Sequence, residues 1–420
     1  MRMLVSLIAF AGCAPQVLWT GSNPDRLVQA QIMARGDTQW VRAAGRDEPR
    51  YQAIGGGGVV FSRDGSRTAY AAERVGRWFM MLDGRPLGPW DGVAEPTFSR
   101  AGDRFAFLAQ TAGAWQVVVD GATSPVAGSV KTDSLRFSPD GRHVGWVAVE
   151  DARCSRIVLD RIPGACRESI PAFRLTNAGP VAVVQHGDGF AILQGDVLGP
   201  ARGAISDWAV SDDGRHVAYV ARAGRQWEVL LDGHPLLTAS RIRDLMFGDD
   251  GNQLAFAAVD PPRSRIVLGN AGGPSFLLVG PPVLAQHASR LVYAAEDEGG
   301  AWVIADGARR GPFGAVLELE LSPDGTHLAY VVRSEGRVRV VHDSTERDLD
   351  AIVPGTLVLS DDGEHWAVVA ADAKTRALWI SVDGRQALPV SQVDVFGDER
   401  SLRPWIRRQM AGVLAGGSPP

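Results

Sequence analysis

The sequence predicts an all-β chain made of about ten repeated units, each with four short antiparallel strands. Three observations lead to this prediction: a turn phrase of the type Ser-Pro-Asp-Gly recurs at a nearly constant interval, a second Asp-Gly pair falls inside five of the units, and the apolar runs between them alternate with period two. The clearest copies of the phrase are Phe137-Ser138-Pro139-Asp140-Gly141 and Leu321-Ser322-Pro323-Asp324-Gly325.

The interval between copies is the strongest of the three signals. The copies, degenerate ones included, begin 35 to 39 residues apart. They start at Phe61, Phe98, Phe137, Leu175, Val210, Phe247, Leu284, Leu321, Leu359 and Phe396. Self-similarity at such a period is typical of repeat proteins, in which each unit buries its apolar face against its neighbours.

The sequence of each unit predicts the same four strands in the same order. A short first strand ends in the Ser-Pro-Asp-Gly turn, and a second strand follows as an alternating run such as residues 217–221. A third strand, often opened by Trp, covers residues such as 227–231 and stops at the second turn, Asp232-Gly233. A short fourth strand closes the unit. Asp-Gly favours tight hairpins because both residues tolerate a positive φ.

A repeated four-stranded unit of roughly 40 residues is typical of a β-propeller blade. The short alternating runs, rich in Val, Tyr, Trp and Phe, argue against a helical solenoid. We interpret the recurring third-strand tryptophans as packing residues between blades rather than ligand-stacking groups. They are Trp40, Trp78, Trp115, Trp227, Trp302 and Trp379.

The phrase and the strand after it resemble the WD40-like repeats of TolB-type propellers. Residues 137–147 and 321–332 follow that family's pattern, a Phe-Ser-Pro-Asp-Gly turn and then an Ala-Tyr strand, almost residue for residue. Weaker copies extend the resemblance over most of the chain. Two units depart from it, at Leu175 and Leu284, because the first lacks the Asp and the second lacks both Asp and Gly. We expect these two turns to differ in shape.

The repeats predict a propeller over residues 23–400, with a flexible tail over residues 401–420. Ten blades is the favoured count, since residues 23–45 align as a degenerate first unit. One continuous ring is favoured by the uniform spacing, although a ring of ten exceeds the usual four to eight. An eight-bladed ring with extra units and two five-bladed rings remain alternatives. Residues 393–398 could complete the N-terminal blade, with residues 17–19 as the competing strand.

The first residues resemble the signal peptide of a bacterial lipoprotein. A positive start at Arg2 and an apolar run over residues 4–11 precede Phe10-Ala11-Gly12-Cys13, which is similar to a lipobox except for Phe10. The resemblance implies a signal peptide at residues 1–12, lipidation of Cys13 and a lipid-anchored linker over residues 13–22. It also implies an outer-membrane lipoprotein facing the periplasm or the cell surface; a plain secretory signal or a cytoplasmic chain are the alternatives.

The two other cysteines fit an exported protein. Cys154 and Cys166 flank the turn at residues 160–164, so a hairpin folded there would place them on facing strands. A disulfide between them is therefore predicted, with two buried thiols as the alternative. A cysteine-based metal site is disfavoured because no further ligands stand at suitable spacing.

The sequence shows no motif of catalysis, and we predict no catalytic residue, cofactor or metal site. No nucleophile elbow, phosphate loop or zinc-peptidase motif occurs. Four histidines share one place in the repeat, two residues after Asp-Gly: His143, His216, His327 and His365. Equivalent positions of different blades lie too far apart for one ion, so we interpret these histidines as supports of the turns.

The composition of the chain excludes some classes of binding partner. The net charge of −5 gives no overall basic field to hold nucleic acid, and beyond the N-terminus no apolar stretch could span a bilayer. The favoured function is a lipid-anchored binding or scaffold module for a protein or glycan of the cell envelope, with the membrane reached through the anchor only. A propeller lyase or hydrolase with its site at the channel mouth, and a TolB-like accessory of an envelope complex, are the alternatives.

Overall fold

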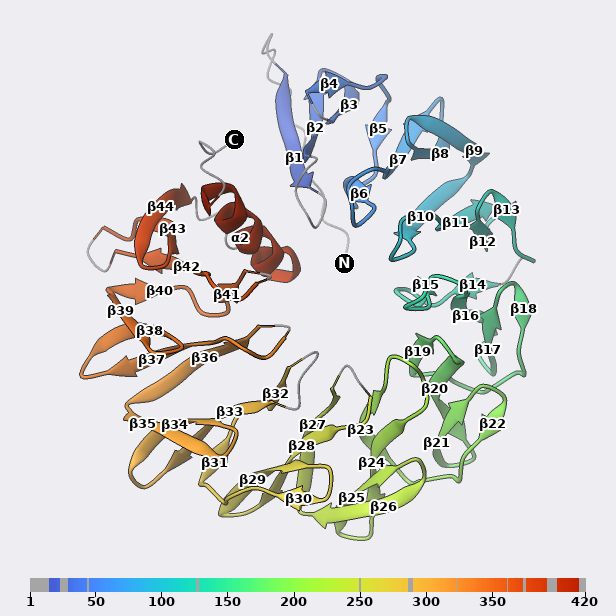
Figure 1. Ribbon diagram of the computed structural model, residues 1–420. Coiled ribbons are helices and arrows are strands. Elements are labelled where there is room, and N and C mark those ends of the chain that lie inside the picture. The colour runs from blue at the N-terminus through green and yellow to red at the C-terminus, as the bar shows by residue number, and fades with distance from the viewer. Residues whose placement is uncertain are drawn as a thin grey trace. The chain divides into compact units, whose positions relative to one another are not determined.

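The computed structural model describes residues 15–22, 29–43, 45–125, 128–248, 251–285, 290–322, 324–360, 362–372, 375–390 and 399–414. These residues form ten antiparallel sheets, which we number 1 to 10 in chain order, and one helix (Figure 1). The all-β fold with ten propeller-type blades is thus confirmed. The chain divides into two compact units, residues 1–185 with 193–197, and residues 186–192 with 198–420.

The first unit contains sheets 1 to 4. Their strands are β1 (Gln16–Ser22), β2 (Gln29–Arg35), β3 (Thr38–Ala43) and β4 (Arg46–Asp47); β5 (Ala53–Ile54), β6 (Val60–Phe61), β7 (Thr68–Arg74), β8 (Arg77–Leu82) and β9 (Arg85–Trp90); β10 (Gly92–Phe98), β11 (Phe105–Thr111), β12 (Ala114–Val119) and β13 (Ala122–Thr123); β14 (Ser129–Val130), β15 (Arg136–Phe137), β16 (Val144–Asp151), β17 (Cys154–Leu159) and β18 (Ile162–Pro163). Sheet 5, in which the boundary between the units falls, consists of β19 (Ala172–Thr176), β20 (Gly179–His186), β21 (Gly189–Gln194) and β22 (Val197–Leu198).

The second unit contains sheets 6 to 10. Their strands are β23 (Ile205–Val210), β24 (Val217–Ala223), β25 (Gln226–Leu231) and β26 (His234–Ala239); β27 (Arg241–Phe247), β28 (Leu254–Asp260), β29 (Arg263–Leu268) and β30 (Ala271–Gly272); β31 (Leu278–Val279), β32 (Val283–Leu284), β33 (Leu291–Asp297), β34 (Gly300–Ala305) and β35 (Ala308–Phe313); β36 (Ala315–Leu321), β37 (Leu328–Ser334), β38 (Arg337–His342) and β39 (Thr345–Leu349); β40 (Ala351–Ile352), β41 (Val358–Leu359), β42 (Trp366–Ala371), β43 (Leu378–Val382) and β44 (Arg385–Val390).

Every sheet has the predicted order of four strands in sequence. In the four sheets that hold five strands, the first strand is broken into two short pieces, and both pair with the same second strand: β5 and β6 pair with β7, for example. The predicted third-strand tryptophans all lie on third strands; Trp40, on β3, is buried.

The core lies between consecutive sheets within each unit. In the first unit, Ile32 and Val41 of sheet 1 pack with Tyr70 and Met81 of sheet 2. Equivalent clusters join sheets 2 and 3, and sheets 3 and 4. The second unit repeats this arrangement from sheet 6 to sheet 10. Alternating side chains of each strand thus reach both neighbouring sheets, as the period-two pattern requires.

Two boundaries of the sequence prediction are wrong. Residues 16–22, expected within a linker, form β1, which pairs with β2 and completes the first sheet. The competing strand at residues 17–19 is therefore the one used, and residues 393–398 lie outside the described residues. β1 forms because β2 would otherwise expose an unpaired edge, and because Trp19 packs on the core shared with sheet 2.

Residues 401–414 of the predicted flexible tail are helical instead, and residues 415–420 lie outside the described residues. Helix α2 (Glu399–Leu414) lies against β41, β42 and β43 of sheet 10 (Figure 1). Leu402, Ile406 and Met410, spaced four residues apart, are buried in a core with Val358 and Ile380. The helix therefore covers the apolar face of the last sheet. No helix of the described residues is long and apolar enough to cross a bilayer.

Candidate functional site

The recurring phrase folds into a turn organised by a buried serine. Ser322 is 1% exposed, and its hydroxyl donates to Asp324 Oδ1 at 2.6 Å while accepting from the backbone N–H of His327 at 2.9 Å. The carboxylate of Asp324 also accepts from the backbone N–H and the hydroxyl of Thr326. These bonds stabilise the ionised form and lower the pKa of Asp324 to about 2.

The same serine–aspartate bond recurs in four other turns. The pairs are Ser62–Asp64, Ser138–Asp140, Ser211–Asp213 and Ser360–Asp362, each with the hydroxyl within 2.5 to 2.6 Å of the carboxylate. In each, this hydrogen bond is the main reason that the pKa of the aspartate lies below its ordinary value. The repeat phrase thus encodes a rigid turn at the end of the first strand.

In seven of the ten sheets, an arginine or a histidine connects the second turn to the first. In seven sheets the residue just before the second strand contacts the aspartate that follows the third strand. The pairs are Arg67–Asp83, Arg104–Asp120, His143–Asp160, His216–Asp232, Arg290–Asp306, His327–Asp343 and His365–Asp383. The other oxygen of each aspartate carboxylate accepts a hydrogen bond from the backbone N–H of the first residue of the second strand. For Asp343 this donor is Leu328. The interpretation of the four histidines as turn supports is therefore confirmed.

At the position just before the second strand, arginine makes contacts with the next sheet that histidine does not make. Arg104 Nη1 donates to the carbonyl oxygens of Gly141 and Arg142 in the next sheet, at 3.2 and 2.6 Å. Arg67 and Arg290 make the equivalent pairs of contacts with the turns that follow them. These guanidinium groups connect neighbouring sheets, whereas a histidine is too short to reach the next turn.

His342 supplies the missing connection beside His327. Its Nε2 lies 2.9 Å from the carbonyl oxygen of Gly363, in the turn of sheet 10, and 3.8 Å from Asp343 Oδ2. Sequence reasoning missed His342, because it does not align with the other four histidines. The available signal was its position. The last residue of the third strand is apolar in most other sheets, as at Leu82, Val119 and Leu231, and it is Gln194 in sheet 5.

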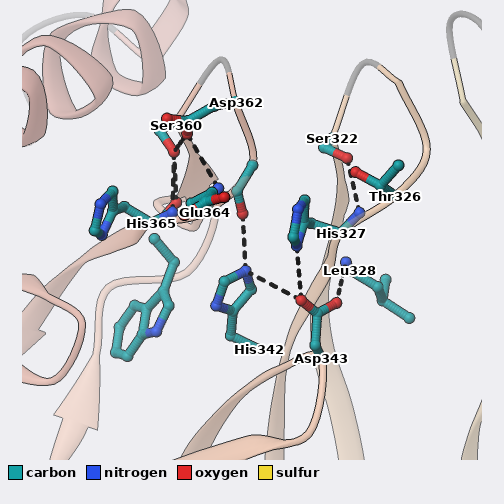
Figure 2. A network of polar contacts seen from close by, with 12 residues as sticks. Ser322, Thr326, His327, Leu328, His342, Asp343, Ser360, Asp362, Glu364 and His365 are labelled. Atoms are coloured by element: carbon teal, nitrogen blue, oxygen red, sulfur yellow. Dashed lines mark hydrogen bonds and ion pairs between the residues drawn. The ribbon is translucent and has the colours of Figure 1, made fainter.

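His327, His342 and Asp343 form a compact cluster (Figure 2). His327 Nδ1 lies 2.8 Å from Asp343 Oδ2, and one ligand atom from each of the three residues lies within 4.8 Å of the other two. The side chains are 29%, 13% and 40% exposed, respectively. Among the described residues, this is the one group of three histidine, cysteine or acidic side chains close enough to share a metal ion.

A hollow of about 400 Å³ lies in the first unit beside the hairpin of β17 and β18. Its lining mixes apolar side chains with a few charged ones, among them Ile157, Ile162, Leu193, Arg167 and Asp196. Ile162, next to the hairpin turn, is 73% exposed. The turn itself holds Asp160 and Arg161 at positive φ, which gives the two-residue hairpin its tight twist.

The predicted disulfide is present at this hairpin. Cys154 opens β17, Cys166 follows β18, and the two are bonded with their Cα atoms 5.2 Å apart. The bond ties the chain leaving the hairpin back to its base and so restrains the rim of the hollow. Cys13 lies outside the described residues, and its lipidation stays a prediction.

The first of the two degenerate turns differs in shape from the Ser-x-Asp-Gly turns, as expected, whereas the expectation for the second falls mostly on residues outside those described. At the first, Asn177 and Ala178 form a two-residue hairpin between paired Thr176 and Gly179, and Asn177 Oδ1 accepts from the backbone N–H of Asp140 in sheet 4. At the second, the short β32 pairs with β33, and residues 286–289 lie outside the described residues. The first turn lines the hollow through Ala178 and Gly179.

No protein-family model and no curated protein matches this sequence. Among solved structures, the chain is similar to a eukaryotic initiation factor, with 12% identity and a TM-score of 0.43, covering 86% of this chain and 94% of that one. It is also similar to TolB from Acinetobacter baumannii, with 15% identity and a TM-score of 0.29, covering 63% and 79%. The propeller of Dos1 is similar at 10% identity and a TM-score of 0.32, covering 77% and 92%. Identities and scores this low transfer no activity and no partner.

Proposed function

We propose that this chain is a non-enzymatic binding module, and that its contact surface is the disulfide-linked hairpin of sheet 4 with the hollow beside it. The observation that carries the proposal is the combination of an open hollow of about 400 Å³ with an apolar side chain, Ile162, left 73% exposed at its rim. Apolar anchors held by a rigid backbone are typical centres of protein–protein contact. We therefore favour a protein over a glycan as the partner.

Rigidity of this surface supports the proposal. Asp160 accepts hydrogen bonds from His143 and from the backbone of Val144, so the turn is fixed at one side. The disulfide fixes it at the other side. A surface ordered before binding loses little conformational entropy when a partner docks, which favours affinity.

The cellular setting is part of the same proposal. An exported module anchored through a lipidated Cys13 in the outer membrane would meet its partner in the periplasm or at the cell surface. The lipobox-like residues 10–13 and the disulfide support export, because disulfides persist in oxidising compartments.

Site-specific crosslinking tests the surface. A photoreactive residue placed at position 162 should yield a discrete crosslinked protein in the native envelope, whereas one at Val75 should not. Val75 is a matched control because it is an apolar residue 81% exposed on a turn of sheet 2. The captured protein, once purified, should bind wild type at least about tenfold more tightly than Ile162→Asp, since buried anchors dominate interface energies. Equal binding by both forms would overturn the proposed surface.

Fractionation tests the setting separately. Wild type should sediment with outer membranes and the Cys13→Ala variant should not. If the alanine variant still fractionates with membranes, the lipid anchor is wrong, whatever the crosslinking shows. A captured small molecule that the chain converts would instead favour the propeller-enzyme alternative, and capture of a known envelope complex would favour the TolB-like accessory role.

A further inference from the structure

We propose that His327, His342 and Asp343 form a binding site for a divalent transition-metal ion of the zinc type. The site goes beyond the proposed binding surface, which belongs to the other unit of the chain. It would place an ion where the turn after β38 meets the Ser-x-Asp-Gly turn of the next sheet (Figure 2).

The separations of the ligand atoms suit such an ion. Zinc binds imidazole nitrogen and carboxylate oxygen at about 2.0–2.2 Å in tetrahedral geometry, so two ligand atoms of one ion stand about 3.4 Å apart. His327 Nδ1 lies 2.8 Å from Asp343 Oδ2, and His342 Nε2 lies 3.8 Å from the same oxygen. These two separations differ from 3.4 Å by about 0.6 and 0.4 Å, and the two imidazole nitrogens lie within 4.8 Å of each other, so rotations of the imidazole rings would have to close the set around an ion.

The ligand atoms of the site determine which metal ions it would prefer. Two imidazoles and one carboxylate suit Zn²⁺, Cu²⁺, Ni²⁺ and Fe²⁺, whereas Mg²⁺ and Ca²⁺ prefer oxygen ligands throughout. Three protein ligands leave at least one position for water or for the carbonyl oxygen of Gly363, which already lies 2.9 Å from His342 Nε2. Binding requires each imidazole to carry its proton on the ring nitrogen that faces away from the ion.

Other turns of the chain have a histidine–aspartate contact but lack a third metal ligand. His216 and Asp232, and likewise His365 and Asp383, make the same imidazole–carboxylate contact at 2.7 Å. The residues before these two aspartates are Leu231 and Val382, so no third ligand is present. At the proposed site that position carries His342, an imidazole only 13% exposed, where most other sheets place an apolar side chain and sheet 5 places Gln194.

Titration of the full chain with Zn²⁺ alone tests the site. The protein is purified without a histidine tag, stripped with a chelator, and titrated calorimetrically with Zn²⁺; Co²⁺ serves as a spectroscopic substitute. Wild type should bind one more equivalent of Zn²⁺ than His342→Leu and should give tetrahedral Co²⁺ absorption bands that this variant lacks. Because even residues that merely support a ligand affect metal affinity by about 10–100-fold, loss of a ligand should weaken binding at least that much.

Each variant introduces a residue that other sheets of this chain carry at the equivalent position, so we expect the variants to fold. Leucine occupies the place of His342 in sheets 2 and 6, and arginine occupies the place of His327 in sheets 2, 3 and 8. His327→Arg should therefore also lose the extra Zn²⁺ while keeping its far-ultraviolet circular dichroism. His216→Arg, the matched control, should bind as wild type does.

Two outcomes would overturn the proposal. One is the same Zn²⁺ stoichiometry and affinity in wild type and in both variants. The other is a melting temperature that His342→Leu lowers equally with and without Zn²⁺, which would leave His342 with only its hydrogen bond to Gly363. A Zn²⁺-dependent rise in melting temperature confined to wild type and His216→Arg would support the site.

Discussion

Arg104 and Asp120 form an ion pair, Nε to Oδ2 at 3.0 Å, and through this pair the guanidinium is held in position to reach the next sheet. The same guanidinium donates to the carbonyl oxygens of Gly141 and Arg142 and lies over the ring of Phe137. One side chain thus supports the hairpin of its own sheet and links it to its neighbour. His143 occupies the same place in sheet 4 and makes only the first contact.

This difference predicts graded effects at position 104. Arg104→His should keep the bond to Asp120 and lose the contacts with sheet 4, which costs about 1–2 kcal/mol of unfolding free energy, and Arg104→Ala should cost about 2–3 kcal/mol. Denaturant unfolding measures both. Arg142→His, at a side chain 83% exposed, is the control and should change little. Equal losses for the histidine and alanine variants would show that the pair with Asp120 contributes nothing.

The Ser-x-Asp-Gly turns predict loss of stability in acid. Hydrogen bonds from serine and from the backbone hold the pKa of the turn aspartates below their unfolded values, that of Asp324 at about 2. Their contribution is therefore complete above about pH 4 and is lost as the pH falls toward 2. Ser322→Ala should raise the pKa of Asp324, measured by nuclear magnetic resonance titration. Its melting temperature should differ from that of wild type most above pH 4 and least near pH 2, while exposed Ser344→Ala should follow wild type throughout.

Removal of the disulfide should destabilise the hairpin of sheet 4. The bond closes a loop between positions 12 residues apart, and the loss of this constraint on the unfolded chain costs about 3 kcal/mol. Cys154→Ser with Cys166→Ser should show this loss in denaturant unfolding. Reductant should lower the stability of wild type to that of the double variant and leave the double variant unchanged; any further effect of reductant on the variant would contradict this account.

Helix α2 should depend on its buried stripe. Ile406 is fully buried against sheet 10, so Ile406→Asp places a charge in the apolar core and should release the helix. Limited proteolysis should then cut within residues 399–414, where wild type resists. Leu414→Asp, at a side chain 41% exposed, is the control and should remain resistant. Equal resistance of both variants would show that the helix is held by the contacts of Arg403 and Arg407 with Glu320 instead.

The sequence by itself determined the all-β fold class and favoured ten repeated units, while it left the arrangement of these units in one or two rings open. Period-two alternation, Asp-Gly turns and the constant spacing are local signals, because the φ of a turn and the alternation of a strand depend on a few neighbouring residues. Asp160 and Gly164 marked the hairpin that brings Cys154 to Cys166 for the same reason. The shared repeat position of His143, His216, His327 and His365 was likewise enough to assign them to the turns.

Only the tertiary structure decided what depends on contacts between sheets. Helix α2 follows no repeat, and its apolar stripe matters because sheet 10 offers a face to cover. The residues of β1 form a strand because β2 presents an open edge. His342 stands 15 residues from His327 in the chain and 21 from Gly363, yet the pairing of β37 with β38 and the packing of sheet 10 bring all three together. No local pattern encodes such a meeting, since it arises from the register of strands and the stacking of separate sheets.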